Sequence, residues 1–195
     1  MKNILVSLLL FSLFLSCDSK DELDEVKINE SYSFVTIEYN AGDSSVVAEI
    51  FNFPAIEYSN GTNSDQIFPV NSLEGWYETS LFESEDPEAF KFDSIEVYVP
   101  SYIDVHNNVY TGYQKWEYSN VMQQQQKPPF EIANNICVKP NTKVIITEKL
   151  FFNKYKVNYR LILENDITGK YMFIEGVWTG TSANHYAISV SSVDL

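Results

Sequence analysis

Apolar and polar residues alternate with a period of two along most of the chain from residue 32 onward. In the segment Asp93–Val99, for example, Ile95 and Val97 fall on one face while Glu96 and Tyr98 fall on the other. This alternation, together with many aromatic and β-branched residues, is typical of β-strands with one buried face. It predicts about eight strands, over residues 32–39, 46–53, 93–99, 109–118, 143–152, 155–163, 171–179 and 186–193.

The segments between these strands predict turns and loops. Asn40–Asp43 has the composition of a hairpin loop, and Phe53–Gly75 is rich in Pro, Gly and Asn, which favours a long loop. Gln123–Pro129 predicts a break in the sheet, with a sub-boundary near 123–135. Glu83–Phe92 is the best helix candidate, with Ser84 as its N-cap. The predicted fold is therefore mostly β with little helix, as an elongated antiparallel β-sandwich or a twisted sheet.

The N-terminal segment has a different pattern. Ile4–Leu15 is an unbroken run of apolar and small residues that follows Lys2. Twelve residues span about 18 Å as a helix, too short for a hydrocarbon core of about 30 Å, so the run indicates a secretory signal. Phe14–Cys17 resembles the lipobox of bacterial lipoproteins. That resemblance implies removal of residues 1–16 and lipidation of Cys17, whereas an ordinary signal peptide cut near Cys17 remains the alternative.

The residues that follow Cys17 are strongly charged. Residues 17–30 therefore predict an acidic, solvated tether in front of a single β-rich domain over 31–195. Lys20–Glu22 resembles the export signal that places lipoproteins of the Bacteroidetes on the cell surface. We expect the protein to be anchored by lipid in the outer membrane, and the resemblance implies exposure on the surface. A plain charged tether is the alternative.

The charge of the chain is −14 and is unevenly distributed. Residues 17–104 contain 20 acidic and 3 basic residues, whereas residues 105–195 contain 7 acidic and 9 basic residues. A chain this acidic lacks the concentrated basic face that nucleic acids require, so nucleic acid is excluded as a partner. The asymmetry indicates either two surfaces with different roles or an acidic half that keeps the protein soluble beside an anionic envelope.

The sequence contains no catalytic motif. It has no Gly-rich phosphate loop, no nucleophile elbow and no paired His or Cys with metal-ligand spacing. His106 and His185 are isolated, and Cys137 is expected to be buried as a small apolar residue. We therefore expect a protein that is not an enzyme and that needs no cofactor or metal.

Two groups of residues are candidates for binding. In a strand over 155–163 and its approach, Lys154, Lys156 and Arg160 share one face, where they can hold an anionic lipid, lipopolysaccharide or an acidic sugar. A solvated strand face is the alternative. Trp116 and Trp178 are candidates for a sugar-stacking surface, and burial in a β-protein core is the alternative for both.

Residues 136–190 resemble the C-terminal β-region of the aerolysin and epsilon-toxin family of pore-forming proteins. The similarity rests on Val138–Val144, on an alternating hairpin on either side of Asn153, on Gly169 and on Ile174–Gly180. It implies an aerolysin-like twisted sheet and an interaction with membranes. The family's insertion hairpin alternates Ser and Thr, and this pattern is not found in residues 100–139.

These observations predict a non-catalytic lipoprotein of the cell envelope that acts as a surface binding module. It is attached to the membrane through its N-terminal lipid, and its ligand is a glycan, an anionic lipid or a protein. The alternative is an aerolysin-like protein that interacts with or perforates membranes. A third hypothesis is an enzyme that acts on envelope glycans with two carboxylates across an aromatic cleft.

Overall fold

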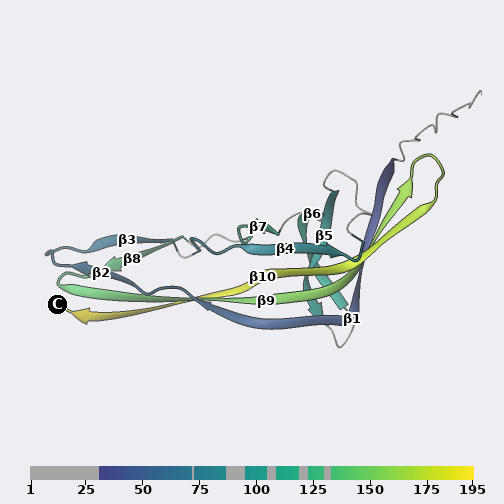
Figure 1. Ribbon diagram of the computed structural model, residues 1–195. Coiled ribbons are helices and arrows are strands. Elements are labelled where there is room, and N and C mark those ends of the chain that lie inside the picture. The colour runs from purple at the N-terminus through teal and green to yellow at the C-terminus, as the bar shows by residue number, and fades with distance from the viewer. Residues whose placement is uncertain (1–30, 72, 87–94, 105–108, 119–122, 130–132) are drawn as a thin grey trace, which may run out of the picture. The chain divides into compact units, whose positions relative to one another are not determined.

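The computed structural model describes residues 31–71, 73–86, 95–104, 109–118, 123–129 and 133–195, and Tyr32–Leu195 form one compact unit. Cys17, His106 and the lipoprotein segments lie outside the described residues. The regular secondary structure of the described residues is all β, which confirms the predicted fold class (Figure 1). The strands are β1 Tyr32–Asn52, β2 Ile56–Asn60, β3 Gln66–Asn71, β4 Glu78–Ser84, β5 Ile95–Asp104, β6 Val109–Tyr118, β7 Gln124–Gln126, β8 Ala133–Val138, β9 Thr142–Asn165 and β10 Tyr171–Asp194.

The main sheet is built around two very long strands. Its order is β1-β9-β10-β4-β7, and β2 pairs with β9 beyond the end of β1. β9 and β10 have 24 residues each and pair from Glu164 and Tyr171 to Thr142 and Asp194. At about 3.3 Å per residue, each strand spans about 80 Å. Two further antiparallel pairs, β3-β8 and β5-β6, form separate small sheets.

Three pairs of predicted strands are single long strands. The expected loop Asn40–Asp43 lies inside β1, where the register against β9 shifts between Asn40 and Ser45. The side chain of Asn40 accepts a hydrogen bond from the backbone N of Gly42 (3.0 Å), and Ser44 Oγ donates to the backbone O of Asn40 (2.7 Å). These bonds form a bulge that β9 bridges, so the hairpin prediction is wrong.

The same correction applies to the other two strands. Asn153 lies inside β9, paired on both sides with Ala48 and Ser182, so no hairpin forms there. The predicted strands 171–179 and 186–193 are parts of one strand, β10. Its register against β9 shifts between Ala183 and His185. The continuous partner strands keep the backbone extended where polar residues favour a turn.

Two loop predictions are also wrong, and the helix prediction is wrong over its described residues 83–86. The predicted loop Phe53–Gly75 contains β2 and β3, and the predicted break at Gln123–Pro129 contains β7, which pairs with β4. In the predicted helix Glu83–Phe92, the first two residues belong to β4, and residues 87–94 lie outside the described chain. Ser84 Oγ accepts a hydrogen bond from the backbone N of Asp86 (3.2 Å), so it caps a local turn that ends a strand.

Cys137 is exposed in β8, contrary to the expectation that it is buried. β8 turns Val138 inward, where that residue is fully buried. Because successive residues of a strand face opposite sides, Cys137 points outward beside Ile67 of β3.

The largest core lies between the main sheet and the β5-β6 hairpin. It contains Val97 and Trp116 from the hairpin and Tyr159 and Trp178 from the sheet. The hydroxyls of Tyr118 and Tyr159 are 2.8 Å apart, and Trp178 Nε1 donates to Ser80 Oγ at 2.9 Å. The hydroxyls of Tyr118 and Tyr159 and the indole N–H of Trp178 are therefore paired inside the core, whereas Trp116 Nε1 is buried without a hydrogen-bond partner among the described residues.

A second core lies where β3-β8 cover one end of β9. Val70, Val138, Val144 and Ile146 are buried in it. The buried side chain of Asn60 lies beside this core and connects β2 to β8, because its Nδ2 donates to the backbone O of Val138 (2.8 Å).

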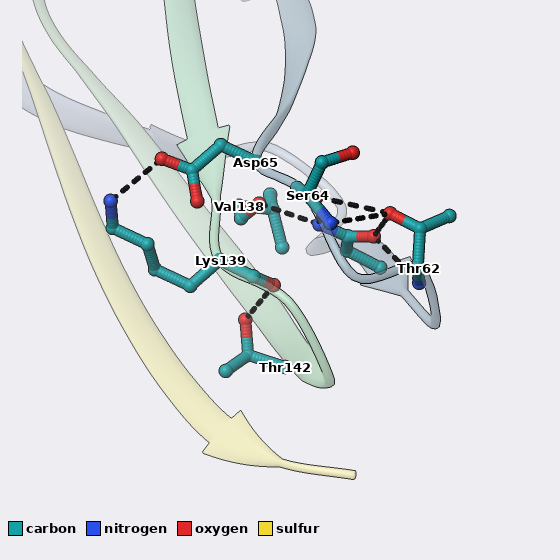
Figure 2. Close-up of polar contacts among 7 residues, drawn as sticks. Thr62, Ser64, Asp65, Val138, Lys139 and Thr142 are labelled. Atoms are coloured by element: carbon teal, nitrogen blue, oxygen red, sulfur yellow. Dashed lines mark hydrogen bonds and ion pairs between the residues drawn. The ribbon is translucent and has the colours of Figure 1, made fainter.

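Polar contacts close the turn around Asn60 (Figure 2). Asn60 Nδ2 also donates to the backbone O of Ser64 (2.8 Å), and Asn60 Oδ1 accepts from Thr62 Oγ1 (2.6 Å). An ion pair of 2.8 Å joins Asp65 to Lys139 outside the turn. One amide therefore fixes both the loop and the strand that it faces.

The turns into and out of β9 follow the sequence pattern. Asn141 has a positive φ of 52° in the turn that precedes β9, and Gly169 has a φ of 66° in the turn that joins β9 to β10. Asn and Gly are the residues that tolerate this conformation best.

Gly176 and Gly180 allow β4 to approach β10 closely. A Cβ atom on Gly176 would contact the backbone O of Glu83, and it would lie 2.7 Å from Tyr159 Oη and 2.9 Å from Ser84 Cα. Two of these atoms belong to the backbone and cannot move without disturbing the β4-β10 pairing.

Glu78 connects the main sheet to the hairpin inside the protein. Its buried carboxylate accepts hydrogen bonds from Gln114 Nε2 (2.8 Å), Gln126 Nε2 (3.3 Å) and the backbone N of Ala183 (2.8 Å). Burial nevertheless raises the pKa of Glu78 above its ordinary value of 4.5, against the lowering effect of these donors.

We expect Gly176→Ala to lower the free energy of unfolding by about 1–3 kcal/mol, because the added methyl group overpacks a backbone contact. Gly61→Ala is the matched control, since a Cβ atom there meets nothing within 4 Å. Urea denaturation of both variants measures the difference. Equal stability of the two variants would contradict the close approach of β4 to β10.

We expect the contribution of Glu78 to stability to fall as the pH rises from about 4.5 through the raised pKa of this carboxyl. Between these two pH values the folded chain retains a proton that the unfolded chain has lost, so the slope of stability with pH is negative. Glu78→Gln lacks the titrating group and should lack this slope. Urea denaturation of both proteins from pH 4 to 8 measures it, and a constant difference across that range would refute the prediction.

Candidate functional site

The predicted basic face lies on the outer side of β9. Lys154, Lys156 and Arg160 are exposed, and they alternate with the buried residues Tyr155 and Val157. The structure therefore places these three cations on one face of one strand, with the opposite face in the core.

Carboxylates lie next to two of the three cations. Lys154 forms an ion pair of 2.8 Å with Glu49, and Arg160 forms one of 2.6 Å with Glu175. Glu38 pairs with Arg160 from the other side in the strand register. In the described part of the chain Lys156 has no ion-pair partner. The face is therefore of mixed charge, which weakens its attraction for anions.

The two candidate tryptophans are buried. Trp116 is 4% exposed and Trp178 is 2% exposed, and both belong to the core between the hairpin and the main sheet. Trp178 packs against the ring of Tyr155 with centroids 5.9 Å apart. The indoles therefore support the fold and offer no surface on which a sugar can stack.

Exposed tyrosines line a groove between β1 and the hairpin. Tyr98 is 54% exposed and Tyr113 is 63% exposed. The groove has a volume of about 380 Å³. We call it the aromatic groove, and its lining residues are Phe34, Val35, Thr36, Ile37, Tyr39, Tyr98, Tyr110 and Tyr113.

Tyr39 forms a rigid wall of the aromatic groove. Its hydroxyl donates a hydrogen bond to the backbone O of Tyr98 (3.1 Å), which joins β1 to β5. Its ring meets that of Trp178 edge-on, with centroids 6.3 Å apart. Burial raises the pKa of Tyr39 above its ordinary range, so the hydroxyl stays protonated and keeps donating at neutral pH.

A second hollow of about 380 Å³ adjoins the aromatic groove at Tyr39. We call it the polar hollow, because its side chains are mainly carboxylates, amides and one guanidinium. They include Glu38, Asn40, Glu85, Asn158, Arg160 and Glu175. Because side chains alternate along a strand, Glu38 and Asn40 fall on the opposite face of β1 from Tyr39, and the polar hollow therefore lies on the outer face of the sheet, away from the hairpin.

No cluster of three or more His, Cys, Asp or Glu residues that can hold a metal ion occurs among the described residues. His185 is exposed, and its ring lies 5.6 Å from that of Phe151. Within the same described ranges, the search for a helix long and apolar enough to cross a membrane found none.

The sequence of the hairpin contains a signal for the aromatic groove, namely tyrosines on the polar face of alternating strands. The candidates predicted from the sequence were the tryptophans instead. Tyr98 lies between the fully buried residues Val97 and Val99 and must therefore face outward. Tyr113 belongs to the exposed side of β6. An aromatic residue on the polar face of an alternating strand indicates an exposed ring, whereas Trp116 and Trp178 fall on the apolar faces. The partnership of these tyrosines with β1 depends on the tertiary fold and has no local signal.

Comparison with protein-family models gives no match, and comparison with curated proteins gives none either. Among solved structures, a lamprey immune protein has a TM-score of 0.50 and 11% sequence identity, over 83% of this chain and 54% of that protein. The chain thus spans about half the length of that protein. An aerolysin-like protein from Bombina maxima has a TM-score of 0.41 and 11% identity, over 84% of this chain and 99% of its own. The parasporin-2 toxin of Bacillus thuringiensis has a TM-score of 0.38 and 12% identity, over 85% of this chain and 73% of its own. The similarity to the lamprey immune protein is a similarity of fold alone.

Proposed function

We propose that this chain is a non-catalytic binding module of the cell envelope that holds a glycan in the aromatic groove. The observation that carries the proposal is the groove itself, where exposed tyrosine rings from the hairpin face β1. Tyrosine rings pack on the apolar faces of sugar rings while their hydroxyls form hydrogen bonds.

The surroundings of the groove suit an uncharged or weakly charged oligosaccharide. Binding pockets commonly combine apolar walls with a few polar groups that fix the orientation of the ligand. Within the aromatic groove the hydroxyls of Tyr98 and Tyr113 supply such groups. Because Arg160 is already paired with Glu175, this guanidinium adds little electrostatic attraction for a strongly anionic ligand.

The wall of the groove is rigid, which favours binding. Tyr39 is held at its hydroxyl by Tyr98 and at its ring by Trp178. A preformed aromatic surface loses little conformational entropy when a ligand binds. Because the aromatic groove is rigid, more of the free energy of a small stacking contact contributes to affinity.

A membrane-interacting protein is the second candidate. It is favoured by the exposed apolar and aromatic side chains Phe34, Val35, Tyr98, Tyr102 and Tyr113 on β1 and the hairpin. Tyrosine is enriched where proteins meet the membrane interface. Flotation with neutral and anionic vesicles, combined with dye release, separates this candidate from glycan binding.

We expect Tyr98→Ala and Tyr113→Ala each to weaken glycan binding about five- to thirtyfold, because each removes a stacking surface worth about 1–2 kcal/mol. The probes are an array of bacterial lipopolysaccharide and capsule oligosaccharides, followed by calorimetry on the oligosaccharide that binds best. Tyr171→Ala is the matched control, since Tyr171 is 58% exposed outside the groove lining. Absence of any binding on the array, or equal losses in all three variants, would refute the glycan proposal.

We expect Cys17→Ser to move the protein from the membrane fraction to the soluble fraction, because a lipid on Cys17 is the proposed anchor. The measurement is detergent partitioning of the full chain, expressed in a Gram-negative host that processes lipoproteins. Cys137→Ser is the control, since Cys137 lies in β8 and should leave partitioning unchanged. Unchanged partitioning of Cys17→Ser would rule out the anchor.

A further inference from the structure

In the part of the chain that the structure describes, one edge of the main sheet is open over a long stretch of β10. β4 pairs with β10 only over Gly176–Gly180. From Thr181 to Asp194, β9 is the only strand that pairs with β10 among the described residues. In Figure 1 the yellow end of β10 runs beside β9 with no labelled strand on its other side. About half of the backbone N–H and C=O groups of such an edge point away from the sheet.

This edge lacks the features that usually keep sheet edges apart. Proline, charged side chains and bulges are common protections. The ten residues His185–Asp194 pair with β9 without a register shift, contain no proline, and include one carboxylate, that of Asp194. By contrast, the open edge of β1 has two register shifts and carries the exposed carboxylate of Glu38 and the half-buried carboxylate of Glu49.

Apolar side chains along the open edge are incompletely covered. Val190 pairs with Ile146, which is fully buried in the second core, yet Val190 itself is 51% exposed. Val193 and Leu195 are also exposed. The second core is therefore uncovered at its β10 side. A further strand beside β10 would bury more of Val190.

We propose that the open edge of β10, residues 185–194, pairs antiparallel with the same edge of a second copy of this chain. An antiparallel pair of identical strands is related by a two-fold axis, and the same surface then closes on itself. This continues the main sheet across the axis and satisfies the outward backbone groups of both copies.

The charges of this part of the chain are nearly balanced, which permits a second copy as the partner. The whole chain has a net charge of −14, which opposes self-association. Residues 133–195, however, contain seven basic and five acidic residues, so two copies do not repel each other strongly here. An axis near the middle of the segment also places each Asp194 beside the other copy's His185, far from the second Asp194.

The paired edge leaves the aromatic groove free. Phe34–Tyr39 of β1 pair with residues 159–163 of β9, whereas His185–Asp194 pair with residues 142–151. A dimer through β10 therefore presents two grooves at once, and simultaneous binding to a repetitive glycan raises the apparent affinity. The pairing itself does not depend on the ligand, so the dimer stands or falls independently of the glycan proposal.

Sedimentation equilibrium of the full chain, purified in density-matched detergent, tests the pairing. We expect a reversible dimer, and we expect Ser189→Lys with Ser191→Lys to weaken it at least tenfold by placing four like charges at the interface. Ser59→Lys is the matched control, because Ser59 is exposed on β2, at the opposite edge of the sheet. A monomer at 100 µM, or equal weakening by the control, would overturn the proposal.

Cysteine cross-linking provides a second readout with single, conservative changes. In a Cys137→Ser background, each residue from 187 to 192 is replaced in turn by Cys and oxidised. An antiparallel pair about a two-fold axis predicts a sharp maximum of disulfide-linked dimer at the residue nearest the axis. Ser59→Cys should not cross-link. Uniform cross-linking, or a maximum at Ser59→Cys, would show that another surface mediates the contact.

Discussion

The pairing of β9 with β10 along 24 residues is the interaction on which the other elements depend. β1 and β2 add to the free side of β9, and β4 adds to β10. The small sheets β3-β8 and β5-β6 then cover two different stretches of the buried face. The neighbouring strands form backbone hydrogen bonds before and after Asn40 and Asn153. These bonds outweigh the local preference of asparagine for a turn. A strand that breaks there would lose hydrogen bonds to its neighbour, and an unmade buried backbone bond costs more than a bulge.

The aromatic groove follows from the way the hairpin is held on that ladder. Tyr155 of β9 donates a hydrogen bond of 2.6 Å to the backbone O of Ser101 in β5, and Glu78 of β4 accepts one from Gln114 in β6. Both contacts are polar and directional, so they fix the position of the hairpin more sharply than apolar packing alone does. The outward tyrosines are consequently presented at a defined distance from β1. The residues that create the groove are thus largely different from those that line it.

The alternation of residues was sufficient to predict which face of a strand is buried. It was insufficient to predict strand continuity, which depends on the neighbouring strands. The buried and exposed faces of β9 were predictable, since Lys154, Lys156 and Arg160 differ so clearly from Tyr155 and Val157. The same rule places Trp116 and Trp178 inward, although their size made them attractive as binding residues. Strand continuity was not predictable, because Asn and Gly favour turns in isolation and the bulge at Asn40 exists only against β9. Cys137 shows the limit of composition, since its apolar neighbours suggested burial while the pleat turned it outward.

The distribution of charge determines which chemistry remains available at the surface. Strand register sets Glu49 beside Lys154 and Glu175 beside Arg160, so two of the three cations that suggested an anion site are paired with carboxylates within the sheet. Pairs of this kind on a surface add little to stability, yet they remove the net charge that would steer a phosphate or a sulfate. In the proposed function, recognition depends on shape and stacking in the aromatic groove, and these contributions weaken little with ionic strength.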